Sequence, residues 1–76
     1  MHGYFLQNKD GKYLKTLDTA NSKLEFTDDY KEARNYIGRP GGGNWDAENE
    51  KEYLKFHFSE EYGDKVTSLR CVYQEW

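Results

Sequence analysis

The aromatic residues constrain the fold of this chain more than any other feature, because a chain of 76 residues has few other means of stabilising a core. A domain of this size buries only about 60% of its unfolded surface, and small domains often compensate with disulfides or a metal. Cys71 is the only cysteine, and no Cys/His cluster has the spacing of zinc ligands. Four Phe, seven Tyr and two Trp remain, and these residues favour strands. The sequence therefore predicts a single β-rich domain over residues 1–76.

The first part of the chain has the pattern of a hairpin followed by a third strand. Residues 3–8 and 12–17 are β-prone runs on either side of Asp10-Gly11. Asp-Gly is typical of two-residue hairpin turns, because glycine adopts a positive φ at little cost. Residues 24–26 then alternate between apolar and polar side chains, which predicts a short third strand.

The next segment has the signals of a helix that begins at about Asp29 and ends at about Ile37. Asp29 is a favourable N-cap residue, and Glu32 follows at the spacing of a capping box. Tyr30, Ala33 and Ile37 would share one helical face. Glycine and proline residues just beyond Ile37 would end the helix, and the glycine-rich stretch 39–44 would be a connector.

Two further strands are predicted in the second half of the chain. Residues 52–59 alternate, so that Leu54, Phe56 and Phe58 would lie on one face, and residues 66–74 would form the last strand. The predicted fold is α+β: a small antiparallel sheet of four to five strands with one helix packed on one face, in the order β-β-β-α-β-β. The predicted core consists of Leu6, Leu14, Leu24, Phe26, Tyr30, Ala33, Ile37, Leu54, Phe56, Phe58, Leu69, Cys71 and Tyr73.

Charge is distributed unevenly along the chain. Between residues 46 and 64, seven acids and two bases give a charge of −5, whereas the remaining seven acids and nine bases give +2. Spaced carboxylates beside exposed Trp and Tyr are typical of a surface that docks onto a basic protein. We call residues 44–64 the acidic lobe. Its predicted protein-binding residues are Trp45, Asp46, Glu48, Glu50, Glu52, Tyr53, Glu60, Glu61, Tyr62 and Asp64.

The sequence contains no recognisable catalytic, cofactor or metal motif, so we expect a non-catalytic protein without cofactor or metal. His57 would lie on the polar side of its strand without an orienting partner, and Cys71 would be a buried, inert thiol. The glycine-rich stretch is not followed by the Lys-Ser/Thr of a phosphate-binding loop, and the acidic stretch lacks the spacing of a calcium-binding loop.

Two alternatives to a protein-binding surface remain open. A nucleic-acid-binding module would use lysines and aromatic residues of the first hairpin, although a pI of about 5.3 makes nucleic acid an improbable partner. A homodimer would pair through an exposed strand edge. The hairpin residues that a nucleic-acid-binding module would use are Tyr4, Phe5, Lys9, Lys12, Tyr13, Lys15 and Lys23.

We expect no membrane association and a cytoplasmic location, because no leader or apolar span is evident and the lone cysteine fits a reducing compartment.

The segments Y-F-L-Q-N-K-D-G-K-Y-L-K and L-E-F-T-D-D-Y-K-E-A-R-N-Y resemble small uncharacterised proteins of phages and prophages of Gram-positive bacteria. Those proteins often open with an aromatic strand and Asn-x-Asp-Gly-Lys-Tyr-Leu, followed later by Phe-Thr-Asp-x-x-x-Glu-Ala. The resemblance covers residues 4–36. It implies an early phage product that binds and modulates or inhibits a host protein, with no catalytic residues. Nucleic-acid enzymes, CRISPR nucleases and proteolytic machines have basic clefts that an acidic lobe could occupy.

Overall fold

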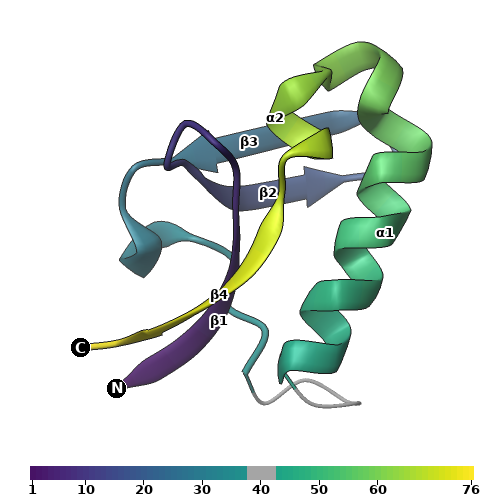
Figure 1. Cartoon of the computed structure of the whole chain (residues 1–76). Coiled ribbons are helices and arrows are strands. Elements are labelled where there is room, and N and C mark those ends of the chain that lie inside the picture. Colours follow the sequence, from purple (N-terminus) through teal and green to yellow (C-terminus); the bar gives the residue numbers. More distant parts are fainter. Residues whose placement is uncertain (38–42) are drawn as a thin grey trace.

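The computed structural model describes residues 1–37 and 43–76 and shows an antiparallel sheet with one long helix packed on one face (Figure 1). The predicted α+β class is confirmed, with four strands in the order β3-β2-β1-β4. The strands are β1 (His2–Gln7), β2 (Tyr13–Asp18), β3 (Lys23–Thr27) and β4 (Arg70–Glu75). The helical elements are the 3-10 turn η1 (Tyr30–Glu32), the long helix α1 (Gly43–Tyr62) and the short helix α2 (Asp64–Thr67).

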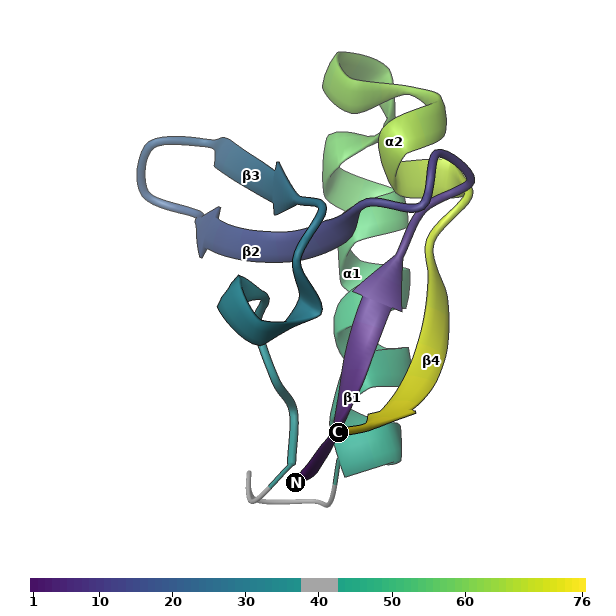
Figure 2. The same ribbon diagram turned by 90° about the vertical axis from the view of Figure 1, so that its left-hand side faces the viewer.

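The sheet consists of two ribbons that diverge from a single point. β1 pairs with β4 along its whole length, and β2 pairs with β3, but β1 and β2 are in register only at Gln7 and Tyr13. Figure 2 shows the β2–β3 ribbon crossing the direction of β1 and β4. Residues 34–36 connect the two ribbons, because the Arg34 N–H donates to the Leu14 carbonyl of β2 at 2.9 Å and the Tyr36 N–H donates to the Tyr4 carbonyl of β1 at 3.0 Å.

The β1–β2 connection confirms the predicted hairpin but is longer than a two-residue turn. Gly11 has the positive φ of 79° that the Asp-Gly pair predicts. The Gly11 N–H donates to the Asn8 carbonyl, and the Asn8 N–H donates to the Lys12 carbonyl. Asn8 Oδ1 also accepts from the N–H groups of Asp10 and Lys12, at 3.0 and 3.1 Å. The side chain of Asn8 therefore organises the turn from inside.

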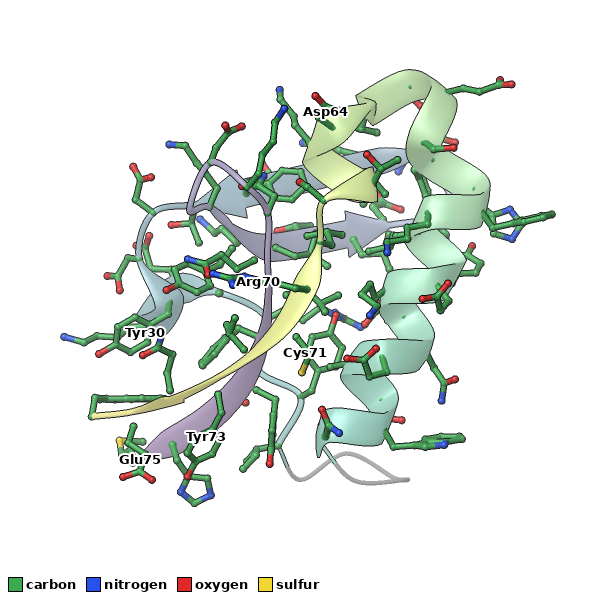
Figure 3. All side chains as sticks on the ribbon, in the orientation of Figure 1. Tyr30, Asp64, Arg70, Cys71, Tyr73 and Glu75 are labelled. Carbon is green, nitrogen blue, oxygen red and sulfur yellow. The ribbon has the colours of Figure 1, made fainter. Side chains whose placement is uncertain are left out.

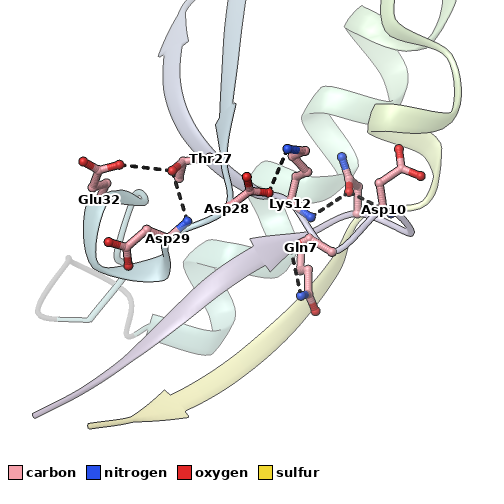
Figure 4. A network of polar contacts seen from close by, with 9 residues as sticks. Gln7, Asp10, Lys12, Thr27, Asp28, Asp29 and Glu32 are labelled. Atoms are coloured by element: carbon pink, nitrogen blue, oxygen red, sulfur yellow. Dashed lines mark hydrogen bonds and ion pairs between the residues drawn. The ribbon is translucent and has the colours of Figure 1, made fainter.

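The helix predicted from Asp29 to Ile37 is wrong, because only η1 is helical there. Asp29 caps this turn as expected, but Glu32 Oε2 accepts a hydrogen bond from Thr27 Oγ1 instead of completing a capping box (Figure 4). The chain beyond the turn is extended and buries Tyr36 completely. Backbone pairing with the diverging strands and the burial of Tyr36 outweigh the weak helical preference of so short a segment.

The strand predicted over residues 52–59 is also wrong, because these residues lie within α1. Ala47, Leu54 and Phe58 are buried at the spacing i, i+7 and i+11, which forms one narrow stripe of a helix. Phe56 was assigned to the same face as Leu54 and Phe58, but it lies on the opposite side of α1 and is 82% exposed. The predicted connector at 39–44 lies largely outside the described residues, apart from Gly43 and Asn44, which begin α1.

The last strand starts at Arg70 instead of residue 66, because residues 64–67 form α2 and carry Val66 into the core. The main core lies between α1 and the sheet. It consists of Leu6, Leu14, Leu24, Tyr36, Ala47, Leu54, Phe58, Val66 and Leu69. Of the predicted core residues outside this set, Phe26, Tyr30, Ala33, Ile37 and Cys71 are half-buried, whereas Phe56 and Tyr73 are exposed.

A second cluster of aromatic rings covers the opposite face of the sheet. Phe5 and Tyr13 are buried there, and Tyr30 from η1 and Trp76 pack over them with ring centroids 5.2 to 6.1 Å apart. Tyr30 lies on the side of the sheet away from α1 (Figure 3). The aromatic residues thus stabilise both faces of the sheet, as large rings do in small domains.

Replacing Phe58 and Phe56 separately by Ala tests this arrangement. We expect Phe58→Ala to lower the free energy of unfolding by about 3–5 kcal/mol, because it leaves a cavity in the core. Phe56→Ala should change it by less than about 0.5 kcal/mol, because the ring is exposed. Urea denaturation followed by circular dichroism measures both values. Equal losses in the two variants would show that both rings are buried on one face.

Candidate functional site

The outward face of α1 carries aromatic side chains that do not take part in the core. Trp45 and Phe56 are 63% and 82% exposed, and Tyr53 between them is exposed as well. Trp45 and Phe56 are eleven residues apart, so they lie on the same side of the helix, about 16 Å from each other along its axis. The His57 ring contacts the rings of Tyr53 and Phe56, at centroid distances of 4.4 and 4.9 Å. We call Trp45, Tyr53, Phe56 and His57 the aromatic stripe.

Carboxylates accompany the aromatic stripe. Glu52 and Glu60 lie on the same side of α1 by helical spacing, and Glu61 is exposed near the end of the helix. With six acids and two lysines, α1 has a charge of −4. Among the described residues, Glu60 and Glu61 form no ion pair, and Glu52 has only Lys51, at 4.0 Å. The outward face is therefore both aromatic and negatively charged.

Three other acids of the acidic lobe, Asp46, Glu48 and Glu50, have contacts or positions that stabilise the fold. Glu50 is bonded to Arg34, because its Oε2 accepts from Arg34 Nε at 3.2 Å, and its side chain is only 14% exposed. Burial, and secondarily the Glu50 carboxylate, raises the pKa of Tyr36 well above its ordinary value. Glu48 pairs with Lys51 one turn along, and Asp46 is half-buried in the first turn, where a carboxylate favours the helix dipole.

Tyr62 and Asp64 do not lie on the outward face of α1. The Tyr62 hydroxyl accepts from the Leu24 N–H at 3.0 Å and donates to the Ser22 carbonyl at 3.4 Å, so it fixes the end of α1 to β3. Asp64 begins α2 and pairs with Lys9 of the β1–β2 turn. The hydrogen bond from Lys9 holds the pKa of Asp64 below its usual range. The structure thus divides the predicted site, and only part of it faces solvent beside the aromatic stripe.

Phe56 and His57 are the site residues that sequence reasoning missed. The alternation of residues 54, 56 and 58 placed Phe56 in the core and His57 on a polar strand face. A helical period over residues 43–62 would have placed Phe56 on the side of Trp45, opposite Leu54 and Phe58. The helical period of residues 43–62 was therefore the sequence signal that could have identified Phe56 as a residue of the outward face.

Two features of the described residues bear on metal and thiol chemistry. No group of three His, Cys, Asp or Glu side chains among them is placed to hold a metal ion. Cys71 faces α1 from β4 (Figure 3), and its Sγ donates to Asn44 Oδ1 at 3.3 Å. Partial burial raises the pKa of this thiol, which disfavours the reactive thiolate. None of the helices described in residues 1–37 and 43–76 is both long and apolar enough to cross a bilayer.

The lysine-rich hairpin is a poor match for a nucleic-acid-binding surface. Lys9, Lys12 and Lys23 each have a carboxylate within ion-pair distance. The rings of Phe5 and Tyr13 are buried, so they are not available to stack on bases.

The chain matches no protein-family model, and the comparisons with curated proteins and with solved structures give no significant match. The resemblance of residues 4–36 to small phage proteins therefore stays a prediction.

Substituting Glu50 and Glu52 separately by Ala tests the division of the acidic lobe. We expect Glu50→Ala to reduce the free energy of unfolding by about 1–3 kcal/mol, because it leaves the half-buried Arg34 without its acceptor. Glu52→Ala, two residues along the same helix, should change it by less than about 0.5 kcal/mol. Thermal and urea denaturation measure the difference. A larger loss for Glu52→Ala would contradict the structural role of Glu50.

Proposed function

We propose that this protein is a non-catalytic protein-binding module that docks the outward face of α1 onto a basic surface of a partner protein. The observation that carries the proposal is the exposure of Phe56 and Trp45 on one side of a helix whose opposite side forms the core. Large exposed aromatic patches mark interaction sites, and Trp and Tyr are enriched among interface anchors.

The geometry supports recognition of a helix in a groove. Trp45 and Phe56 stand three turns apart, so they would enter two apolar pockets of the partner about 16 Å from each other. Glu52, Glu60 and Glu61 would meet Lys or Arg side chains at the rim of the groove. Such complementary charges accelerate encounter and exclude acidic partners, whereas the aromatic anchors govern dissociation.

The negative charge of α1 disfavours a second copy of this chain or a nucleic acid as the partner of the outward face. A second copy docked through the same face would bring two helices of charge −4 together, and nucleic-acid phosphates would meet the same carboxylates. A homodimer through the edge strands β3 or β4 avoids this repulsion. Self-association without a captured partner would distinguish this homodimer from docking onto another protein.

The resemblance of residues 4–36 to small phage proteins extends the proposal. The partner would then be a host protein in the cytoplasm, and the module would modulate or inhibit it. A nucleic-acid enzyme, a CRISPR nuclease or a proteolytic machine has a basic cleft of the required kind. Carboxylates spaced along α1 would occupy such a cleft in place of phosphates.

Capture from a nuclease-treated bacterial lysate, followed by binding kinetics on the captured protein, tests the proposal. We expect Phe56→Ala to accelerate dissociation and to weaken binding by about 30-fold or more, as loss of a central aromatic anchor does. Tyr73→Ala is the matched control, because Tyr73 is an exposed aromatic residue on β4. A folded Phe56→Ala protein that binds as tightly as the unaltered protein would contradict the proposal.

Two triple charge reversals distinguish the effect of the carboxylates on α1 from the effect of the protein's net charge on association. Reversing Glu52, Glu60 and Glu61 to Lys should slow association, most strongly at low salt. Reversing three acids elsewhere changes the net charge equally and should have a much smaller effect. The control acids are Asp10, Glu25 and Asp28. Equal effects of both triple reversals would show that no local surface is recognised, and self-association without a captured partner would favour the strand-edge homodimer.

A further inference from the structure

A shallow cavity lies at the β1–β2 turn, away from the outward face of α1. Its volume is about 380 Å³, and no apolar side chain lines it. It lies where the turn meets the junction between α2 and β4. Its lining residues are Gln7, Asn8, Lys9, Gly11, Ser68 and Arg70.

Hydrogen bonds fix the walls of this cavity. The Lys9 N–H donates to Ser68 Oγ at 3.0 Å and joins the turn to the segment before β4. Gln7 bridges the two sides, because its Nε2 donates to the Gly11 carbonyl and its Oε1 accepts from Arg70 Nη2, each at 3.3 Å. Arg70 reaches toward β1 from the start of β4 (Figure 3). The cavity is therefore formed before any ligand arrives.

Two of the residues that line this cavity, Asn8 and Arg70, have hydrogen-bond donors with spare capacity. Arg70 forms no ion pair with any described residue and uses one N–H group on Gln7, so most of its planar donor set is unused. Asn8 is only 4% exposed, and its Oδ1 already accepts two backbone N–H groups. Its Nδ2 is thereby fixed as a donor, and no acceptor among the described residues contacts it.

We propose that this cavity binds an oxyanion, either a carboxylate or a phosphate group. The Arg70 guanidinium would hold two of its oxygens, since the fork of donors matches both groups. Asn8 and the Lys9 ammonium would complete the site. The site is independent of the aromatic stripe and of the partner proposed for it.

Asp64 sets the affinity of this site. Its carboxylate pairs with Lys9 at the rim, so a bound oxyanion would compete with it for the ammonium and meet its negative charge. Removing the charge of Asp64 should therefore free Lys9 and strengthen the binding of an anion.

Titration of the protein with sodium phosphate, and separately with sodium acetate, at constant ionic strength tests the site by NMR. We expect saturable shifts of the Arg70 Nε–H and Asn8 Nδ2 signals, with sodium chloride as the blank. Arg70→Gln should weaken binding about tenfold or more, because it removes a charge-assisted pair. Asp64→Asn should strengthen it severalfold. Lys15→Gln, an exposed lysine on β2 that does not line the cavity, should leave it unchanged.

The two anions distinguish the ligand classes, because saturation by phosphate alone or by acetate alone assigns the site to that group. The Arg70→Gln spectrum must keep the dispersion of the unaltered protein, which shows that the variant is folded. The anion affinity of Asp64→Asn tests the site without altering Arg70. Absence of saturable shifts with both anions would overturn the proposal. Equal affinity of Arg70→Gln would show adventitious attraction to surface charge only, and no gain with Asp64→Asn would contradict competition between Asp64 and the anion for Lys9.

Discussion

The packing of one narrow stripe of α1 against the sheet is the contact on which the rest of this structure depends. Ala47, Leu54 and Phe58 bring the helix into the main core, and they occupy only one side of it. Two further contacts hold the helix in place: Glu50 bonds to Arg34 along its length, and Tyr62 bonds to β3 at its end. If this face binds a partner as we propose, a helix held by these contacts would lose less conformational entropy on binding.

The sequence predicted those parts of the fold that depend on local signals. Gly11 has the positive φ that its position after Asp10 suggested, and β3 follows the alternation around Leu24. The segment beyond Asp29 was misassigned because a valid N-cap does not determine helix length. There the pairing of the Tyr36 N–H with β1, a contact distant in sequence, decides the conformation. Local propensity cannot report such a contact.

The candidate site was predictable in composition but not in geometry. Acids and aromatic residues do gather between residues 44 and 64, yet their roles depend on which side of α1 they face. Apolar residues at 54, 56 and 58 fit a strand period, and Phe56 breaks the helical period because it is not part of the core. An exposed apolar residue that breaks the helical period is consistent with the docking face that we propose.

Relaxation of the phenylalanine ring protons by a soluble gadolinium chelate reports directly whether Phe56 faces solvent while Phe58 is buried. The chelate reaches only exposed protons, so it reports which side of α1 each ring occupies. Phe56 should relax strongly, to a similar extent as the Trp45 indole, whereas Phe58 should be nearly unaffected. Equal protection of Phe56 and Phe58 would place both rings in the core, and would contradict the exposed aromatic face on which the proposed function rests.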